Sequence, residues 1–267
     1  MYAMLTVTIG NSIYWRYASF EPSAGFASGN ITLNVKWFTA SQLKKATDII
    51  MEYKNDDDDT IMRRLSFVSE QANDSFVFRL QQASTISDEA EKHIMLEYED
   101  TLLLKFIESD DKGLYVQRVT RENNASAGSL AVRMRKAINT EPPESRNILR
   151  FMLELNNKLD DILNLVSIRK EEGSRPMRTV GISAAGFVLH DEELIPDGAL
   201  AYTHCTVGDG EDRTIMSALL EVKQLKAAET GFFYMARFIH LKDDLIDGIV
   251  KYLFSRERDM IKGIRDL

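Results

Sequence analysis

The chain has 267 residues, of which 44% are hydrophobic and 28% are charged, with only 5 prolines and 14 glycines. This composition is typical of one large or two ordinary globular domains, and it argues against long disordered linkers. The net charge of −8 gives no sign of the basic field that general nucleic-acid binders carry, so we expect no nucleic-acid partner.

The first part of the chain, residues 1–140, is predicted to be a mixed α/β region of unknown role. Apolar and polar residues alternate over 31–37, which predicts a half-buried strand. The Thr-Ala-Ser-Gln run at 39–42 resembles a capping box and predicts the start of a helix. The apolar face of that helix would carry Leu43, Ala46, Ile50 and Tyr53.

Four aspartates follow one another within residues 55–59. They lack the alternating spacing and central glycine of a calcium-binding loop, so we expect a solvated loop there. Helices are predicted over 60–71 and 87–98, and a strand is predicted over 75–80.

Residues 101–120 leave two alternatives open. Apolar runs at 102–107 and 114–119 would form paired strands around a turn-like sequence, or a helix would continue through Ile107. The polar stretch 121–126 is predicted to be a loop, and residues 127–138 are predicted to be helical.

Pro142-Pro143 is the clearest break in the first half, and a heptad pattern follows it. Apolar residues separated by 4, 3, 4, 3 and 4 positions form a seam, which we call the heptad seam: Ile148, Met152, Leu155, Leu159, Ile162 and Val166. The spacing predicts a long helix over about 144–168, within a linking segment at 141–170.

Two interpretations of this helix remain open. It packs on its own domain, or it carries self-association as a homo-oligomer. We favour self-association because a strict a/d seam is narrower than the apolar stripe of an ordinary core helix. Additional leucines beside the seam would widen it into a bundle interface: Leu149, Leu153, Leu163 and Leu165.

Beyond Gly173, short apolar runs alternate with turn residues, which is typical of an all-β barrel or sandwich. The predicted runs lie at 177–182, 186–189, 199–206, 214–224 and 231–238. A closing helix is predicted over 242–264, and its buried face would carry Leu245, Ile249, Tyr252 and Leu253.

The sequence Gly181-Ile182-Ser183-Ala184-Ala185-Gly186 resembles the Ser-x-x-Gly half of the nucleotide-binding motif of PilZ domains. The order of elements over 174–267 is also similar to that family: a strand, the Ser-x-x-Gly turn, a second strand, a Pro-Asp-Gly loop, three strands and a final helix. The resemblance implies an α+β fold. A PilZ-like antiparallel β-barrel with a closing helix would occupy 171–267, preceded by the long heptad helix and the mixed N-terminal region.

PilZ domains hold cyclic di-GMP with an Arg-x-x-x-Arg segment and an Asp/Asn-x-Ser-x-x-Gly turn, in which arginine makes charge-assisted bonds and glycine allows close approach. The resemblance therefore implies these ligand-binding residues: Arg169, Arg175, Arg178, Ser183 and Gly186. Gly181 stands where the family has Asp or Asn. The four-residue arginine spacing occurs nearby only in Arg146 and Arg150, on the long helix.

Two functions remain open. One is a cyclic di-GMP signalling adaptor that acts on a protein partner, in the motility, pilus or surface-attachment machinery that the family implies. The other is a degenerate PilZ module that binds proteins without nucleotide. A converging pair of arginines beside Ser183 would distinguish them.

The sequence favours no enzyme and predicts no catalytic residue, metal or cofactor. None of its four histidines has another histidine at metal-ligand spacing, and phosphate-loop and nucleophile-elbow motifs are absent. Its one cysteine, Cys205, excludes an intrachain disulfide. Residues 1–10 do not resemble a signal peptide, and no apolar run approaches the ~18 residues of a membrane span, so we expect a cytoplasmic location.

Overall fold

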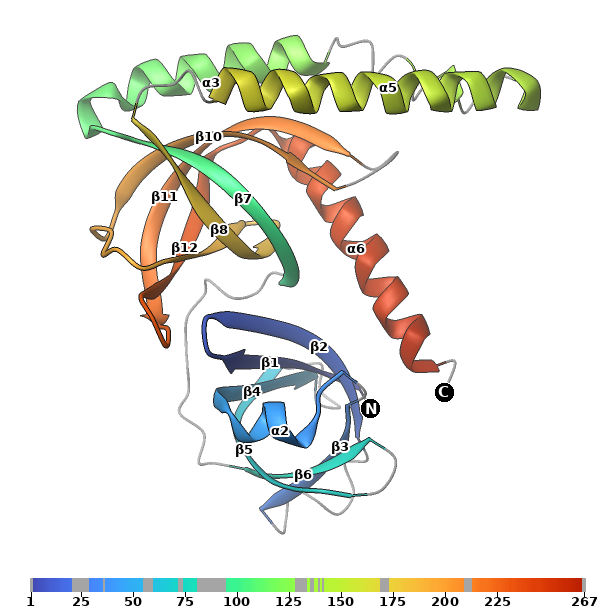
Figure 1. The fold of residues 1–267 in the computed structure, drawn as a ribbon, viewed down its shortest axis with the longest axis vertical. Helices are drawn as coiled ribbons and strands as arrows, with labels where there is room; N and C mark the ends of the chain where they lie inside the picture. The colour runs from blue at the N-terminus through green and yellow to red at the C-terminus, as the bar shows by residue number, and fades with distance from the viewer. Residues whose placement is uncertain are drawn as a thin grey trace.

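The computed structural model describes residues 2–20, 29–35, 37–54, 60–71, 74–80, 95–127, 134, 137–138, 140, 142–168, 173–208 and 213–265. These residues form two closed antiparallel β-barrels, one above the other, with long helices at the far end and along one side (Figure 1). The fold is therefore α+β with β-barrel sheets. The sequence predicted only one barrel, in the C-terminal part, whereas described residues 2–80 of the expected mixed α/β region form a second one.

The first barrel has the strand order β1-β2-β3-β6-β5-β4. Its strands are β1 (Tyr2–Ile9), β2 (Ser12–Phe20), β3 (Asn30–Asn34), β4 (Ala46–Lys54), β5 (Thr60–Glu70) and β6 (Ser75–Leu80). A short helix, α2 (Ala40–Lys44), connects β3 to β4. The barrel encloses a continuous apolar core that includes the fully buried Leu5, Leu33 and Phe78.

The second barrel has the strand order β10-β11-β12-β9-β8-β7. Its strands are β7 (Leu96–Ile107), β8 (Ser174–Ser183), β9 (Gly186–Asp191), β10 (Ala199–Val207), β11 (Thr214–Ala227) and β12 (Phe232–His240). Five strands match the runs predicted after Gly173. The sixth, β7, comes from before the long helix and closes the barrel by pairing with β8 and β10, so the barrel includes residues outside the expected 171–267.

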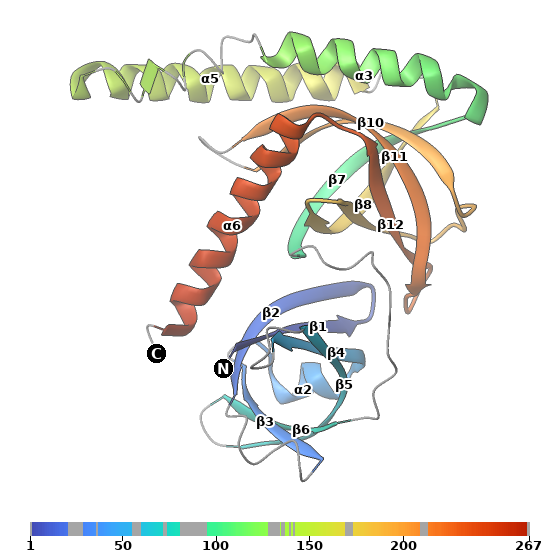
Figure 2. The same cartoon turned by 180° about the vertical axis from the view of Figure 1, so that it is seen from behind.

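Helices cover the second barrel on two sides (Figure 2). After β7 and the short 3-10 turn η2 (Ser109–Asp111), helix α3 (Lys112–Ala127) packs on β11. Helix α5 (Pro143–Ile168) lies at the same end of the molecule, close to the range predicted for it. Helix α6 (Asp243–Arg265) runs from the second barrel toward the first. Its residues Ile249, Tyr252 and Leu253 are buried as predicted.

The helix predicted through residue 53 is mostly wrong. The capping box is present, because the Thr39 side chain accepts from the Gln42 backbone N–H, but α2 ends at Lys44. The following residues form β4, in which Ile49, Met51 and Tyr53 are buried at every second position. The same residues fit both a strand, with apolar residues at every second position, and a helix, with an apolar face every 3.6 residues. Pairing with the neighbouring strands, which closes the barrel, favours the strand.

The helix predicted over 60–71 is also wrong, because these residues form β5 between β4 and β6. The strand predicted at 75–80 is confirmed as β6. The strand predicted at 31–37 is confirmed over Asn30–Asn34, whereas Trp37 lies in the turn that follows.

The region after residue 95 mixes right and wrong predictions. The strand alternative at 102–107 is confirmed within β7, and β7 also replaces the helix predicted at 96–98. The strand at 114–119 and the loop at 121–126 are wrong, since both belong to α3. Packing of α3 on the barrel buries Val119, which the local sequence alone does not reveal.

Some predictions fall outside the described residues. These are the acidic loop at 55–59, the helix at 87–94, most of the helix at 127–138, and Arg169. Among the helices of the described part, none is long and apolar enough to cross a membrane.

Candidate functional site

The Ser183 turn joins β8 to β9 in a tight hairpin, with Ser183 paired to Gly186. Ser183 is fully buried, and its hydroxyl bonds stay inside the turn. Its Oγ accepts from the Ala185 backbone N–H at 3.2 Å and donates to the Gly186 carbonyl at 3.4 Å. The serine therefore acts as a turn residue that supplies hydrogen bonds to the local backbone.

Gly186 is required by the packing of the neighbouring strand. Its φ is +151°, and a Cβ there would lie 2.1 Å from the carbonyl oxygen of Ala236 in β12. The contact between β9 and β12 excludes any side chain at this position, so the glycine needs no ligand to explain it.

Gly181, which stands in place of the motif's acidic or amide residue, is covered by the first barrel. A Cβ at position 181 would lie 2.5 Å from the ring of Trp15 in β2. Trp15 is only 6% exposed and belongs to an apolar cluster between the two barrels, the inter-barrel cluster: Ile13, Trp15, Val180, Val188, Phe233 and Met235. An aspartate at 181 would require this indole to move.

Arg175 is held by two carboxylates. Its guanidinium bonds Asp191 at 2.6 Å and Glu193 at 2.5 Å, and it lies 5.3 Å from the centre of the Phe106 ring. These contacts attach the arginine to β7, to Asp191 at the end of β9 and to Glu193 just beyond it.

Arg178 instead connects the two barrels. It donates to Ser12 Oγ at 3.2 Å in the first barrel and pairs with Glu99 at 3.1 Å in β7. Along an extended strand at ~3.3 Å per residue, its Cα is about 16 Å from that of Ser183. The Cα of Arg175 is about 26 Å away on the same estimate. The described arginines of the predicted site do not converge on the turn.

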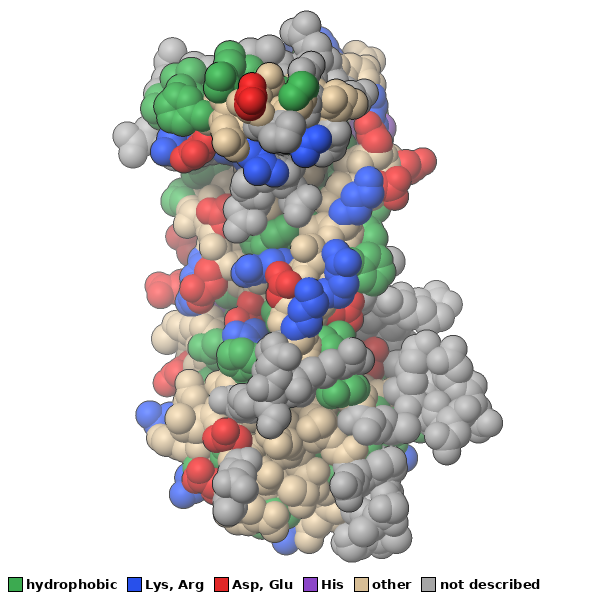
Figure 3. Space-filling view, turned by 90° about the vertical axis from the view of Figure 1, so that its right-hand side faces the viewer, with side chains coloured by type: hydrophobic (Ala, Val, Ile, Leu, Met, Phe, Trp, Pro, Cys, Tyr) green, Lys and Arg blue, Asp and Glu red, His purple; other side chains and the backbone are tan. Residues whose placement is uncertain are grey.

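A cleft of about 480 Å³ lies between the first barrel and α6. Its walls carry Arg16, Trp37, Glu97, Tyr98, Glu99, Tyr252, Arg256 and Met260. Three of these, Tyr252, Arg256 and Met260, recur every four residues and so share one face of α6. Trp37 is 46% exposed on the opposite wall. Figure 3 views the molecule from the side of α6 and shows basic and acidic side chains intermingled over the described residues of this face.

Contacts between the barrels hold the cleft walls in place. Arg16 bonds Glu97, with one N–O distance of 2.5 Å, and the Tyr17 hydroxyl donates to Glu257 on α6. Burial raises the pKa of Glu97, although the neighbouring Arg16 acts in the opposite direction.

Among the described residues, Arg256 makes no ion pair, so it is the cleft cation that remains available to an anion. An exposed indole and this guanidinium suit an aromatic anion.

The described members of the heptad seam lie on the outer face of α5. Ile148, Leu159 and Ile162 are 64%, 59% and 57% exposed, and Met152 and Leu155 are nearly half exposed. Leu149 and Leu153 instead pack on Met134 and Ile138 within the chain. The helix therefore has one face covered by its own chain and one apolar face that is not covered by any described residue.

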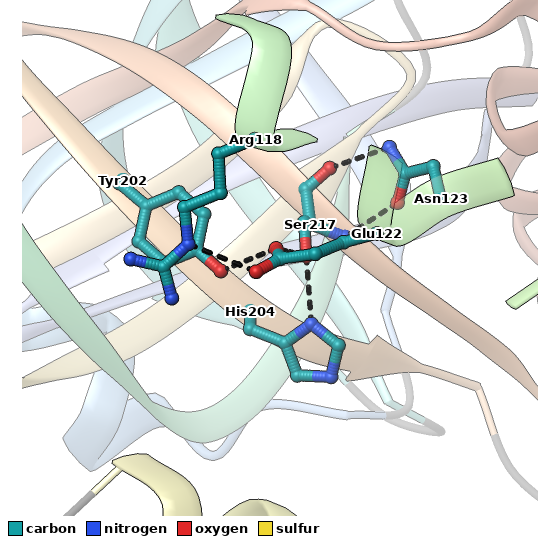
Figure 4. A network of polar contacts seen from close by, with 6 residues as sticks. All are labelled: Arg118, Glu122, Asn123, Tyr202, His204 and Ser217. Atoms are coloured by element: carbon teal, nitrogen blue, oxygen red, sulfur yellow. Dashed lines mark hydrogen bonds and ion pairs between the residues drawn. The ribbon is translucent and has the colours of Figure 1, made fainter. Parts of the chain in front are cut away.

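A polar network that the sequence did not suggest joins α3 to the second barrel (Figure 4). Glu122 accepts from Arg118 Nε at 2.9 Å, from the Tyr202 hydroxyl at 2.6 Å and from Ser217 Oγ at 2.6 Å. His204 Nδ1 lies 2.7 Å from the same Ser217 Oγ. Ser217 is fully buried, and its hydroxyl donates its proton to Glu122. In a catalytic serine the hydroxyl proton is instead directed to the histidine, so this arrangement does not activate Ser217 as a nucleophile.

Asn123 completes the attachment of α3. Its side-chain amide donates to the Ser217 carbonyl at 2.9 Å and accepts from the Ser217 N–H at 2.8 Å. β12 pairs with β11 only as far as Leu219. Asn123 therefore supplies hydrogen bonds to the β11 backbone at Ser217, beyond the end of that pairing. Burial disfavours the charged form of Glu122, but the hydrogen bonds from Arg118, Ser217 and Tyr202 outweigh it and lower its pKa.

Cys205 follows His204 on β10 but faces the barrel core. It is 7% exposed, and burial raises the pKa of its thiol to about 12. The thiol is therefore protonated at neutral pH and cannot act with its neighbour, as expected for adjacent residues on a strand.

The sequence did not suggest Trp15, Arg16 or Trp37 as site residues. Residues 12–20 form β2, in which Ile13 and Trp15 are buried in the inter-barrel cluster. No local pattern reveals that an outward-facing Trp15 would reach Gly181, because that contact depends on how the barrels dock.

No protein-family model matches the chain, and no curated protein matches it. Solved structures of PilZ-domain proteins do match it. The inhibitor of motility MotI/DgrA from Bacillus subtilis is 8% identical, with a TM-score of 0.34 and coverage of 97% of this chain and 96% of that chain. YcgR from Escherichia coli, in complex with c-di-GMP, is 9% identical, with a TM-score of 0.35 and coverage of 99% and 88%.

A tetrameric PilZ domain from Xanthomonas campestris, self-assembled via a helical bundle, is 19% identical, with a TM-score of 0.32. The match covers 64% of this chain and 90% of that chain. Identities and TM-scores in this range do not transfer a ligand, a partner or an assembly to this chain.

Proposed function

We propose that this chain is a PilZ-type signalling adaptor of the bacterial cytoplasm that acts through protein contacts, and that its Ser183 turn is structural. The observation that carries this proposal is the packing of Trp15 against Gly181. The position from which a PilZ motif would reach a nucleotide is filled by the chain's own first barrel. The proposal is the second of the two functions that the sequence left open.

The electrostatics of the predicted site support the same choice. Ser183 is fully buried, and Arg175 and Arg178 already bond carboxylates. Exposed ion pairs are weak, typically ~0–1 kcal/mol, so a phosphate could displace one of them. It would still meet arginines about 16 Å or more from the turn, too far to act together with it.

Self-association through α5 is part of this proposal. Five described residues of the heptad seam are 45–64% exposed on one helix face. A surface stripe of this kind on a charged, folded protein is typical of an interaction site. The output partner would belong to the motility, pilus or surface-attachment machinery that the PilZ resemblance implies.

A second candidate function is a cyclic di-GMP-regulated adaptor that binds its ligand in the α6 cleft. The cleft of about 480 Å³ favours it, because Trp37 offers a stacking surface and Arg256 a cation without a described ion-pair partner. Ligand bound there would touch both the first barrel and α6, and would bias their relative position.

Calorimetric titration of the full chain with cyclic di-GMP tests these proposals, together with Trp37→Ala and Arg178→Ala variants. We expect no binding heat at tens of micromolar for any of the three proteins. Heat that is lost in Arg178→Ala but kept in Trp37→Ala would overturn the proposal and restore the Ser183 site. Heat that is lost only in Trp37→Ala would also overturn it, in favour of the cleft.

A further inference from the structure

A pocket of about 410 Å³ lies between the two barrels, beside the inter-barrel cluster, with which it shares Trp15. Its floor is the outer face of the first barrel. The facing wall comes from Val188 and Leu225 of the second barrel and from Met95, just before β7. Strands β1 and β2 lie at the end of the first barrel that faces the second (Figure 1). The pocket is therefore the part of the interface that the docked barrels do not fill.

The strand register explains the shape of the floor. Thr6 of β1 pairs with Trp15 of β2 on one side and with Ile50 of β4 on the other. Side chains alternate along a strand, and Leu5 and Val7 point into the barrel core, so Thr6 points outward. Threonine is the shortest side chain of this row, so the floor is hollow between the indole and the isoleucine.

Methionine lines the pocket at three positions, Met4, Met62 and Met95. Each of these side chains is half-buried. Methionine is flexible, and its sulfur makes favourable contacts with aromatic rings. Small-molecule sites are typically pockets of ~300–1,000 Å³, often at domain interfaces, with mainly apolar walls and a few polar groups. These walls therefore suit a small aromatic ring system.

The charged groups of the lining balance one another. Asp48 pairs with Arg64 at 3.0 Å and with Lys226 at 3.5 Å. Lys226 also donates to Thr8 Oγ1 at 2.6 Å. Together with Glu52, the lining carries two acidic and two basic residues, so its formal charge is zero. A charged ligand would lose hydration and would compete with these contacts, whereas an uncharged ligand would not.

We propose that this pocket binds a small, uncharged, planar aromatic molecule. Such a ligand goes beyond the adaptor function proposed above, which requires no small molecule. It would contact β1, β2, β4 and β5 of the first barrel and β9 and β11 of the second. It would therefore bind the docked barrels better than separated ones, and would stabilise the docked arrangement. A cyclic dinucleotide does not suit these walls, because its phosphates are charged and its guanine edges are polar.

The test is a nuclear magnetic resonance titration of the full chain, labelled at its methionine methyl groups, with 2-naphthalenemethanol. This probe is uncharged and has two fused aromatic rings. We expect the signals of Met4, Met62 and Met95 to shift saturably. The signal of Met260, which lines the α6 cleft, should stay unchanged. A shift confined to Met260, or no shift of any methionine at the solubility limit of the probe, would overturn the proposal.

Two occluding variants and a matched control locate the ligand. Thr6→Phe fills the hollow in the floor without entering the core of the first barrel, so the methionine shifts should be lost. Met62→Trp fills the pocket from β5 and should have the same effect. Thr32→Phe makes the first substitution at an exposed position of β3 and should leave the shifts unchanged. Binding that persists in an occluding variant, shown to be folded by circular dichroism, means that the ligand lies elsewhere and overturns the pocket.

A charge series tests the class of ligand. 2-Naphthoate and 2-naphthylmethylammonium carry the same rings with a negative and a positive charge. Each should bind about tenfold more weakly than the alcohol, because its charge loses hydration and the lining offers no net counter-charge. An acid or an amine that binds as tightly as the alcohol would overturn the uncharged class.

Discussion

The indole of Trp15 lies against the backbone of Gly181, so that a Cβ added at 181 would be 2.5 Å from the ring. This contact joins the second strand of one barrel to the strand that enters the Ser183 turn of the other. The residue that distinguishes this turn from the PilZ motif is thus also the residue that allows the barrels to dock.

Replacement of Trp15 should weaken this docking. Trp15→Ala removes a large side chain that is 6% exposed, and such changes typically cost about 3–5 kcal/mol. The matched control Trp37→Ala removes the same side chain where it is 46% exposed, and should cost much less. Urea unfolding midpoints compare the two, and equal midpoints would contradict the buried role of Trp15.

A methyl group at position 181 should be destabilising although the strand conformation tolerates it. Gly181→Ala inserts Cβ into the Trp15 ring, and overpacking of this kind costs about 1–3 kcal/mol. Gly113→Ala is the matched control, because nothing lies within 4 Å of its Cβ, and alanine in a helix is favoured over glycine by up to ~1 kcal/mol. The melting temperature should therefore fall in Gly181→Ala and rise in Gly113→Ala. Shifts of the same sign would refute the contact between Gly181 and Trp15.

The attachment of α3 should depend on Asn123. Asn123→Ala leaves the N–H and carbonyl of buried Ser217 without these side-chain bonds, at a cost of about 1–3 kcal/mol per unsatisfied group. Hydrogen exchange at residues 214–218 should accelerate in this variant. Arg121→Ala, an exposed change on the same helix, is the control. Unaltered protection in Asn123→Ala would show that α3 does not protect this edge of β11.

Acid should loosen the same helix through Glu122. Its pKa in the folded protein is below the ordinary value of 4.5, so its contribution to stability is complete above 4.5 and is lost as the pH falls through the lower folded value. The melting-temperature difference between wild type and Glu122→Gln should therefore be constant from pH 7 to about 5 and should shrink as the pH is lowered from 4.5 toward 3. A melting-temperature difference that does not change between pH 7 and 3 would contradict a lowered pKa of Glu122.

A single charge in the heptad seam should disrupt the self-association proposed above. Leu155→Asp places a carboxylate in the middle of the seam, where burial without a partner is costly, so the mass should fall to that of one chain. Asn147→Asp adds the same group on an exposed part of α5 outside the seam and should leave the mass unchanged. Sedimentation at several protein concentrations measures both variants.

Local sequence patterns suffice to predict the elements whose apolar spacing is unambiguous. Five strands after Gly173, the closing helix α6 and the extent of α5 follow from apolar spacing and turn residues within each segment. The PilZ resemblance at the Ser183 turn also depends on a short continuous run.

The remaining features depend on contacts between distant parts of the chain. Barrel closure turned residues 46–54 and 60–70 into strands and recruited β7 across more than sixty intervening residues, and these are long-range pairings that no local window contains. The burial of Ser183, the ion pairs of Arg175 and the ring over Gly181 likewise depend on residues distant in the chain. A motif specifies which groups are present, but packing decides whether those groups face a ligand or the protein's own interior.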